Sequence, residues 1–339
     1  MKAFVTGSTG LLGSNLVQLL VERGYEVTVL ARSVAKARTI FDGVDVSIVQ
    51  GDMNDIDAFA PPMAGCDVLF HTAAFFREYY QPGEHWGELE RINVTGTIKL
   101  LEAAEQQGVK KVVYTSSVGV IGHAPSGAVS DESTPPDHIA RNNLYFWSKV
   151  LAEQAIDKFL EQHQIPVVLI LPGWMFGPRD NAPTGSGQVV LSYLNQQLPG
   201  IFTGGNYAVD ARDVAQGMVN AVQHGQSGER YIIAGRSTSF AEIVQTLEQV
   251  SGVPAPKNRI PYWVSFSAAW LSERYSRLTG RPTLISMDSV QSLYRHQQIS
   301  SQKAEQALDV SFRPLEETLR DEVMWYRQHR PDLIGGVKG

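Results

Sequence analysis

The sequence predicts an α/β fold, with a doubly wound parallel sheet followed by a small mixed α/β lobe. Short apolar segments alternate with segments of helical periodicity through the first half of the chain, as in successive strand–helix–strand units. A glycine-rich turn joins the first strand, over residues 2–6, to a helix over residues 14–23. We expect the sheet domain over residues 1–177, the lobe over 178–330 with segments around 201–235 returning to the core, and a flexible tail over 331–339.

Composition and charge restrict the class of protein. The chain has 339 residues, of which 43% are hydrophobic, so it can bury a full core. Its net charge of −6 argues against a nucleic-acid-binding surface, and no apolar run reaches the roughly 18 residues that span a bilayer. The single cysteine, Cys66, cannot form an intrachain disulfide and is expected to be buried. We expect a cytoplasmic protein without a signal peptide and without a metal site.

The turn after the first strand reads Gly-Ser-Thr-Gly-Leu-Leu-Gly from Gly7 to Gly13. Gly7 allows a tight turn, Gly10 lets a pyrophosphate approach the backbone, and Gly13 lets the helix pack on the strand. The N–H groups at the start of the helix then face the anion. An ordinary strand–helix turn is the alternative, but the position favours a nucleotide site. Its predicted contacts are Gly7, Thr9, Gly10, Leu11 and Leu12.

Residues after the second, third and fourth strands indicate which nucleotide is bound. Arg32 stands where an acidic residue would bind the ribose of NAD, and a guanidinium suits the 2′-phosphate of NADP. We therefore expect NADP(H) rather than NAD(H), with a solvated charge as the alternative for Arg32. Asp52 and Met53 are candidates for the adenine, although Asp52 could equally be a cap, and Ala73 is small enough for close approach. The three strands are predicted over residues 26–31, 44–50 and 68–71.

Candidate substrate contacts follow these strands. An aromatic loop over residues 75–80 could form a wall of the substrate pocket or simply pack in the core. A helix over residues 88–107 carries Asn93, and a strand over residues 111–116 delivers Ser116 and Ser117 at its end. In a parallel sheet, ligands bind at the carboxyl ends of the strands, which is where the loop and the serines are expected to lie.

Tyr145 and Lys149 are four residues apart at the start of a helix that runs to about residue 162, so they share one face. A free tyrosine titrates near pH 10, and a neighbouring ammonium lowers that pKa, which makes the phenol a better proton shuttle at neutral pH. The spacing alone is a weak pattern, since an exposed lysine beside a core aromatic produces it too. The serine-ended strand and the nucleotide turn that precede it strengthen the catalytic interpretation.

The chain resembles the extended short-chain dehydrogenase/reductase family through TGSTGLLG, HTAA, INVTGT, YTSS, YFWSKVLAE and LPGWMFGPRD, which occur in the family's order. The most similar subgroup is the dihydroflavonol 4-reductase-like proteins, which include members described as NAD-dependent epimerase/dehydratases. The resemblance implies a Rossmann-type domain in which Tyr145 is the acid/base and Lys149 lowers its pKa and holds the nicotinamide ribose. It also implies that Ser117 orients the substrate oxygen and that Asn93 shapes the site.

Other positions bear on the cofactor and the substrate. The strand over residues 167–171 runs into Pro172 and Trp174, at a turn that passes the nicotinamide carboxamide in the family. Sugar-nucleotide epimerases commonly place an asparagine near the position of Trp174, and dehydratases carry an Asp-Glu pair where this chain has Val118 and Gly119. The bulky Trp174 and the aromatic loop therefore favour an apolar or aromatic carbonyl substrate.

The lobe carries fewer functional signals. Residues 181–187 are interpreted as a flexible polar lid, and residues 207–215 as a strand and helix that return to the core, with Asp210 and Asp213 in structural roles. The aromatic stretch over residues 262–271 is interpreted as a buried helix of the lobe, with a dimer or membrane surface as the alternative.

Three functions compete. The leading hypothesis is NADPH-dependent reduction of a ketone or aldehyde, with Tyr145 donating the proton and Ser117 bonding the same oxygen. A sugar-nucleotide epimerase would use the same residues with retained NAD, and Arg179, Arg212 and Arg259 could hold its diphosphate. A nucleotide-binding sensor without catalysis is the third hypothesis, which the intact catalytic set disfavours. The expected partners are a small carbonyl substrate and, by resemblance, a second copy bound through the helices over residues 88–107 and 145–162.

Overall fold

The computed structural model describes residues 1–76, 85–279, 290, 293–294 and 297–335. Its main sheet has seven parallel strands in the order β10-β6-β5-β4-β1-β2-β3, so the strand order reverses between β1 and β4. This is the Rossmann-type arrangement that the sequence predicted. The strands are β1 (Lys2–Thr6), β2 (Glu26–Ala31), β3 (Val46–Gln50), β4 (Val68–His71), β5 (Lys111–Thr115), β6 (Val167–Pro172) and β10 (Arg230–Ile233).

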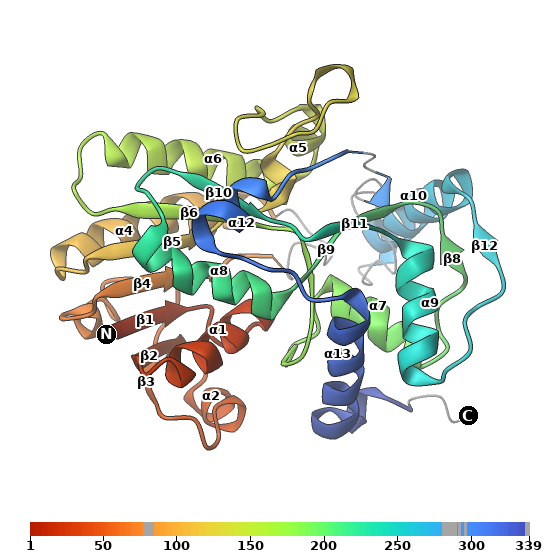
Figure 1. The fold of residues 1–339 in the computed structure, drawn as a ribbon, viewed down its shortest axis with the longest axis horizontal. Coiled ribbons are helices and arrows are strands. Elements are labelled where there is room, and N and C mark those ends of the chain that lie inside the picture. The colour runs from red at the N-terminus through yellow and green to blue at the C-terminus, as the bar shows by residue number, and fades with distance from the viewer. Residues whose placement is uncertain (77–84, 280–289, 291–292, 295–296, 336–339) are drawn as a thin grey trace.

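Helices cover both faces of this sheet, and each face has its own apolar core (Figure 1). On one face, Leu16 and Leu20 pack with Met218, while Leu100 and Ile156 belong to the core of the opposite face. The helices of the first face are α1 (Leu11–Glu22), α2 (Val34–Ile40), α8 (Ala211–His224) and α12 (Gln302–Leu308). Those of the second face are α3 (Trp86–Leu89), α4 (Gly96–Gln106) and α6 (Leu144–Leu160), preceded by the short α5 (His138–Asn142).

The helix predicted over residues 88–107 is not a single regular helix. It consists of α3, a π-helical segment over Glu90–Thr95, and α4. The hydrogen bonds of a π-helical turn span one residue more than those of an α-helical turn, and such turns are frequent at functional sites. Asn93, the candidate site residue of this region, lies within the π-helical segment and is buried.

The small lobe lies beside the carboxyl edge of the main sheet (Figure 1). Residues 207–215 divide between the two parts, because β9 joins a sheet of the lobe while α8 packs against α1 on the main sheet. The lobe strands are β7 (Trp174–Phe176), β9 (Gly205–Asp210) and β11 (Arg236–Ser239) in one sheet, and β8 (Ile201–Phe202) with β12 (Arg259–Ile260) in another. Its helices are α7 (Gly185–Leu194), α9 (Phe240–Ser251), α10 (Tyr262–Thr279) and α13 (Leu315–His329).

The aromatic stretch over residues 262–271 forms the helix α10, but the prediction that it is buried is wrong. Trp263 is 70% exposed and Trp270 is 51% exposed. The small residues Ser265 and Ala269, four positions apart, are buried instead. An aromatic-rich helix packs through its small residues here, so its large side chains lie on the outer face.

The prediction of a flexible lid over residues 181–187 is also wrong. The buried Asp180 carboxylate accepts hydrogen bonds from the Thr184 backbone N–H at 2.7 Å and from the Thr184 hydroxyl at 2.8 Å. Thr184 in turn caps α7, whose first turn includes Gly187. A buried carboxylate that fixes the preceding loop therefore replaces the expected lid.

Three further observations concern the cysteine, the C-terminal segment, and possible membrane and metal sites. Cys66 is buried, as predicted. Asn195, directly after α7, holds the C-terminal segment, donating to the Leu333 carbonyl and accepting from the Gly335 N–H. Within the described ranges, none of the helices combines the length and the apolarity that crossing a bilayer requires, and no group of three or more His, Cys, Asp or Glu side chains could hold a metal ion.

Candidate active site

The turns after β1 and β4 form a cradle made mainly of backbone, which we call the nucleotide cradle (Gly7, Gly10, Gly13 and Ala73). Gly7 has a φ of +67°, and a Cβ built on it would lie 2.5 Å from the Ala73 nitrogen. A Cβ on Gly13 would lie 2.2 Å from the Gly7 carbonyl oxygen. By contrast, a Cβ on Gly10 would have only that oxygen within 4 Å, at 3.4 Å. Gly7 and Gly13 thus serve packing, while Gly10 faces open space.

The nucleotide cradle fits a pyrophosphate. Gly10 precedes α1 and offers no side-chain cap, so the N–H groups of the first helical turn, including those of Leu11 and Leu12, have no intrahelical acceptor. These N–H groups and the positive end of the helix dipole favour an anion. The cradle lies where the strand order reverses, which is the place where dinucleotides bind in open α/β sheets. The described residues around Thr9 therefore suit the phosphates of a dinucleotide.

The predicted specificity residues lie further along the same edge. Arg32 follows β2 and is exposed, and no acidic residue lies between it and the end of α2. Asp52 uses Oδ1 to accept a hydrogen bond from the Asn54 backbone N–H at 2.9 Å, which closes a turn; none of the described helices begins here, so the helix cap considered above is wrong. Met53 is half-buried beside Gly96. Contacts of Asp52 and Met53 with an adenine stay a prediction.

Tyr145 lies at the start of α6, where Asn143 caps the helix by accepting from the Phe146 backbone N–H at 3.0 Å. Its ring is buried, 4.7 Å from the Phe76 ring and 5.8 Å from the Phe146 ring between centroids. Part of the aromatic loop therefore packs against the predicted acid/base. Residues 77–80 of that loop lie outside the described residues.

Lys149 lies one turn further along the same face of α6 and is 2% exposed. Its Nζ donates to the Tyr114 hydroxyl at 3.2 Å and to the Thr115 carbonyl at 2.8 Å, so β5 fixes two of its three N–H groups. Burial lowers the pKa of Lys149 to about 7, and the Glu153 charge partly opposes this. The third N–H remains for the phenol or for a bound nucleotide.

The two serines at the end of β5 have different roles. Ser116 is buried and donates its hydroxyl proton to the Glu153 carboxylate. Ser117 is half-buried, and its hydroxyl oxygen accepts from the Gly119 backbone N–H at 3.1 Å. Among the described residues, the structure gives no acceptor for the Ser117 proton. Ser117, rather than Ser116, therefore keeps a hydroxyl proton that could go to a substrate oxygen, and the role that the resemblance gives it stays a prediction.

Asn93 connects the aromatic loop to α6. Its Oδ1 accepts from the Phe75 N–H at 2.7 Å, and its Nδ2 donates to the Phe75 carbonyl at 3.1 Å and to the Ser148 hydroxyl at 3.0 Å. These three bonds place the loop against the helix that carries Tyr145. The structure thus gives Asn93 a positioning role, and a direct catalytic role stays a prediction.

Pro172 is the last residue of β6, and Trp174 is the first residue of β7. Both follow the same carboxyl edge of the main sheet as the nucleotide cradle. A Cβ on Gly173 between them would lie 2.6 Å from the Ala234 carbonyl oxygen, so the backbone passes close to β10 here. The half-buried Trp174 ring packs edge-on against Phe176, with centroids 4.7 Å apart. Trp174 therefore packs against the apolar core of the lobe, and its contact with a nicotinamide stays a prediction.

Sequence reasoning missed Glu153 and Tyr114. Glu153 is buried and lies on α6 four residues after Lys149, so the spacing Tyr145–Lys149–Glu153 could have identified it. Burial raises its pKa, while the charge of Arg230 and the hydrogen bond from Ser116 oppose the rise. Tyr114 had no such signal, because its contact with Lys149 crosses from strand to helix.

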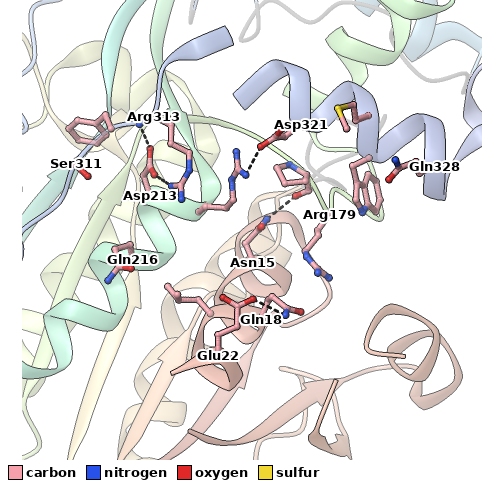
Figure 2. Close-up of a pocket in the computed structure, with 16 residues that line it drawn as sticks. Asn15, Gln18, Glu22, Arg179, Asp213, Gln216, Ser311, Arg313, Asp321 and Gln328 are labelled. Carbon is pink, nitrogen blue, oxygen red and sulfur yellow. Dashed lines mark hydrogen bonds and ion pairs between the residues drawn. The ribbon is translucent and has the colours of Figure 1, made fainter. Parts of the chain in front are cut away.

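A groove of about 690 Å³ lies between α1, α8 and α13 (Figure 2). Its lining includes Arg179 and Arg212 but not Ser117, Tyr145 or Lys149. Arg212 forms ion pairs with Asp210 and Asp321, and Arg313 pairs with Asp213. Two of the groove's arginines are thus neutralised by carboxylates, and Asp210 and Asp213 have the structural roles predicted for them.

Comparison with known proteins gives consistent results. A family model described as the NAD dependent epimerase/dehydratase family matches residues 3–234. A putative dihydroflavonol 4-reductase of Synechocystis sp. is 35% identical over 330 residues, which cover 96% of this chain and 94% of that protein. The sterol demethylase protein B of Methylococcus capsulatus is 30% identical and covers 97% and 99%. The crystal structure of gox2253 superposes with a TM-score of 0.81 at 30% identity, covering 97% and 98% of the two chains.

Proposed function

Because the chain belongs to the NAD-dependent epimerase/dehydratase family, and is an NAD(P)-dependent oxidoreductase of the extended short-chain dehydrogenase/reductase type, we propose that it uses NADPH to reduce a ketone or aldehyde. The observation that carries this proposal is the arrangement of Ser117, Tyr145 and Lys149. Lys149 bonds the Thr115 carbonyl, two residues before Ser117. Tyr145 lies one turn before Lys149 on α6, and β5 ends at the carboxyl edge that also carries the nucleotide cradle.

Each residue has a definite task in this reaction. Tyr145 donates its phenolic proton to the oxygen of the substrate carbonyl, and Ser117 donates a hydrogen bond to the same oxygen. The Lys149 ammonium lowers the pKa of Tyr145 by favouring the phenolate. Gly10, together with the first-turn N–H groups of α1, holds the cofactor phosphates. The bound cofactor supplies the hydride.

The preference for NADPH over NADH rests on Arg32. Arg32 follows β2, and the sequence has no acidic residue from there to the end of α2, so its guanidinium suits a 2′-phosphate. Substituting Arg32→Asp should weaken NADPH binding by at least tenfold, because it replaces attraction with repulsion, and should weaken NADH binding far less. Fluorescence titration of both nucleotides measures this. Equal affinity of the unchanged protein for the two nucleotides would contradict the preference.

The proposed substrate class is a small apolar or aromatic carbonyl compound. Phe76 packs against the Tyr145 ring, and the half-buried Trp174 lies at the border with the lobe. Apolar side chains around a few polar groups are typical of pockets for apolar ligands. Two relatives point the same way through their names, since dihydroflavonols contain aromatic rings and sterols are apolar ring compounds.

The epimerase alternative finds less support in this structure. It requires cationic side chains for a diphosphate, and the sequence offered Arg179, Arg212 and Arg259. Arg179 and Arg212 line the groove of Figure 2 instead, and two carboxylates already neutralise Arg212. Net oxidation of NADPH by an added carbonyl compound supports the reductase. Turnover of a sugar nucleotide with retained NAD and no net redox change would support the epimerase.

The substitution Tyr145→Phe tests the mechanism. It removes the proton donor while keeping the ring that packs against Phe76. We expect kcat for carbonyl reduction to fall by roughly 10²- to 10⁴-fold, with nucleotide affinity nearly unchanged. Steady-state kinetics and NADPH titration measure the two effects. Retention of wild-type turnover by this variant would show that Tyr145 is not the proton donor.

A further inference from the structure

Lys149 is held by the strand beneath it rather than by its own helix. Its Nζ donates to the Tyr114 hydroxyl at 3.2 Å and to the Thr115 carbonyl at 2.8 Å. It also lies 4.8 Å from the centre of the Tyr114 ring, within the range of a cation–π interaction. Thr115 contributes only backbone, so in the described part of the chain Tyr114 is the side chain that bonds the ammonium.

Tyr114 is fully buried and remains a neutral phenol. Burial raises its pKa well above that of free tyrosine, and the nearby Glu153 and Tyr145 raise it further. Its oxygen therefore accepts a hydrogen bond without carrying a negative charge. An ammonium donates three hydrogen bonds and accepts none, so such an acceptor favours the charged form of Lys149.

A buried polar cluster packs beside the Tyr114 ring. The Thr97 hydroxyl lies 2.7 Å from the Asn93 carbonyl and 3.2 Å from His71 Nε2, and it also hydrogen-bonds Tyr114. His71 Nδ1 lies 2.8 Å from the Thr6 hydroxyl, so both ring nitrogens have a hydroxyl partner. Burial lowers the pKa of His71 to about 3, so the ring is neutral. Its centroid is 5.6 Å from that of Tyr114, which is thus packed against an uncharged, hydrogen-bonded surface.

The titratable groups around Lys149 come from several elements. Tyr145 and Glu153 share its helix, Tyr114 faces it from β5, and His71 acts on it from β4. Glu153 is the nearby carboxylate, and Ser116, Arg230 and Asp157 act on its charge in turn. Tyr114 differs from all of them because it bonds Lys149 directly and carries no charge.

We propose that Tyr114 is a positioning residue, whose hydroxyl fixes the Lys149 ammonium beside Tyr145 and keeps it protonated. Its effect on turnover rests on the proposed function, in which Lys149 makes Tyr145 a usable acid. Its effect on Lys149 itself does not rest on that function. The two effects can therefore be measured separately.

The substitution Tyr114→Phe keeps the ring and removes only the oxygen acceptor. We expect kcat for carbonyl reduction to fall roughly tenfold, the effect of one hydrogen bond to a charged group. In the reverse reaction, alcohol oxidation requires the Tyr145 phenolate, so activity rises with pH. Because a less protonated Lys149 raises the pKa of Tyr145, this rising limb should move up by about one pH unit in the variant.

The matched control is Tyr193→Phe. Tyr193 is equally buried and donates its hydroxyl to the Val253 carbonyl in the lobe, remote from Lys149 in the fold. We expect Tyr193→Phe to lose stability but to keep the rising limb of the pH profile for alcohol oxidation at its wild-type position. A purely structural role for Tyr114 would make the two variants alike, with lower stability and an unchanged limb.

A second measurement needs no turnover. The pKa of the Lys149 ammonium can be followed by NMR in 15N-lysine-labelled protein, with the signal assigned through Lys149→Met. We expect Tyr114→Phe to lower this pKa by about one unit, since the charged form loses an acceptor. An unchanged Lys149 pKa overturns the proposal, whatever the kinetics show. If Tyr145→Phe kept full turnover, the proposed function would fail, and the NMR titration alone would still decide the role of Tyr114.

Discussion

The nucleotide cradle and the chemical centre (Ser117, Tyr145 and Lys149) lie at the same edge of the sheet but are built in opposite ways. The cradle consists of backbone, and it depends on the absence of Cβ atoms at Gly7 and Gly13. The chemical centre consists of side chains, and it depends on a lysine buried beside Tyr114. One site is therefore sensitive to added atoms, and the other to lost hydrogen bonds and changed charge.

The largest effect expected from this difference is at Gly7. Substituting Gly7→Ala puts a Cβ 2.5 Å from the Ala73 nitrogen, on backbone that cannot move aside, at a φ of +67°. We expect a loss of several kcal/mol of unfolding free energy, roughly 3 or more, together with loss of nucleotide binding. Urea unfolding and NADPH titration measure the two effects.

The control for this prediction is Gly24→Ala. Gly24 has a similar φ of +76°, but a Cβ there would have nothing within 4 Å. The Gly24→Ala variant should therefore lose only the cost of placing a non-glycine residue at a positive φ, about 1–2 kcal/mol of unfolding free energy. If the two variants lost equal stability, the close approach of Gly7 to Ala73 would have no energetic importance, and the cradle would be an ordinary turn.

In the chemical centre, the adjacent serines should separate catalysis from stability. Ser117→Ala removes the donor to the substrate oxygen, so we expect kcat to fall by roughly 10²-fold at nearly unchanged stability. Ser116→Ala leaves the buried Glu153 without one of its donors and should cost about 1–3 kcal/mol of stability, with a smaller effect on kcat. Steady-state kinetics and urea unfolding of both variants test this. The reverse pattern would assign the catalytic role to Ser116.

The same contrast explains what the sequence could predict. Glycines, apolar runs and the Tyr145–Lys149 spacing are local features, so the sheet, the glycine turn and the pairing of Tyr145 with Lys149 on one helix face could be predicted from them. The exposed face of α10 could not be predicted, because a stretch rich in Trp and Tyr does not reveal that its small residues Ser265 and Ala269 form the packing face. The lid prediction failed because the contacts of Asp180 with Thr184 depend on burial, which the local composition does not show.

The buried lysine should make the chemical centre costly for folding. In the unfolded chain Lys149 keeps its proton up to its ordinary pKa of 10.5, whereas burial lowers that pKa to about 7 in the folded protein. Between these pH values the unfolded state binds more protons, so the contribution of Lys149 to stability rises with pH. Lys149→Met should abolish this rise and stabilise the protein at pH 7 by about 2 kcal/mol while abolishing turnover.

Urea unfolding from pH 6 to pH 10 checks this prediction, with the difference between wild type and variant as the measured quantity. Other titrating groups cancel in that difference when they are remote from Lys149. Glu153 is not remote from Lys149, so its titration does not cancel fully. Its protonation also depends on its contacts with Ser116 and Arg230. A difference that stays constant across this pH range would show that Lys149 keeps an ordinary pKa in the folded protein.

The smallest effect on folding is expected within the cradle itself, at Gly10. A Cβ there would meet only the Gly7 carbonyl oxygen at 3.4 Å, and its φ of −83° suits any residue, so Gly10→Ala should change stability by less than about 1 kcal/mol. The added methyl group would instead occupy the space in which a pyrophosphate approaches the backbone, so we expect NADPH binding to weaken by roughly tenfold or more. Unfolding and titration of this one variant thus separate the two uses of glycine in the cradle. Gly7 serves the fold, and Gly10 serves the ligand, so unaltered NADPH affinity in Gly10→Ala would place the phosphates elsewhere on this edge of the sheet.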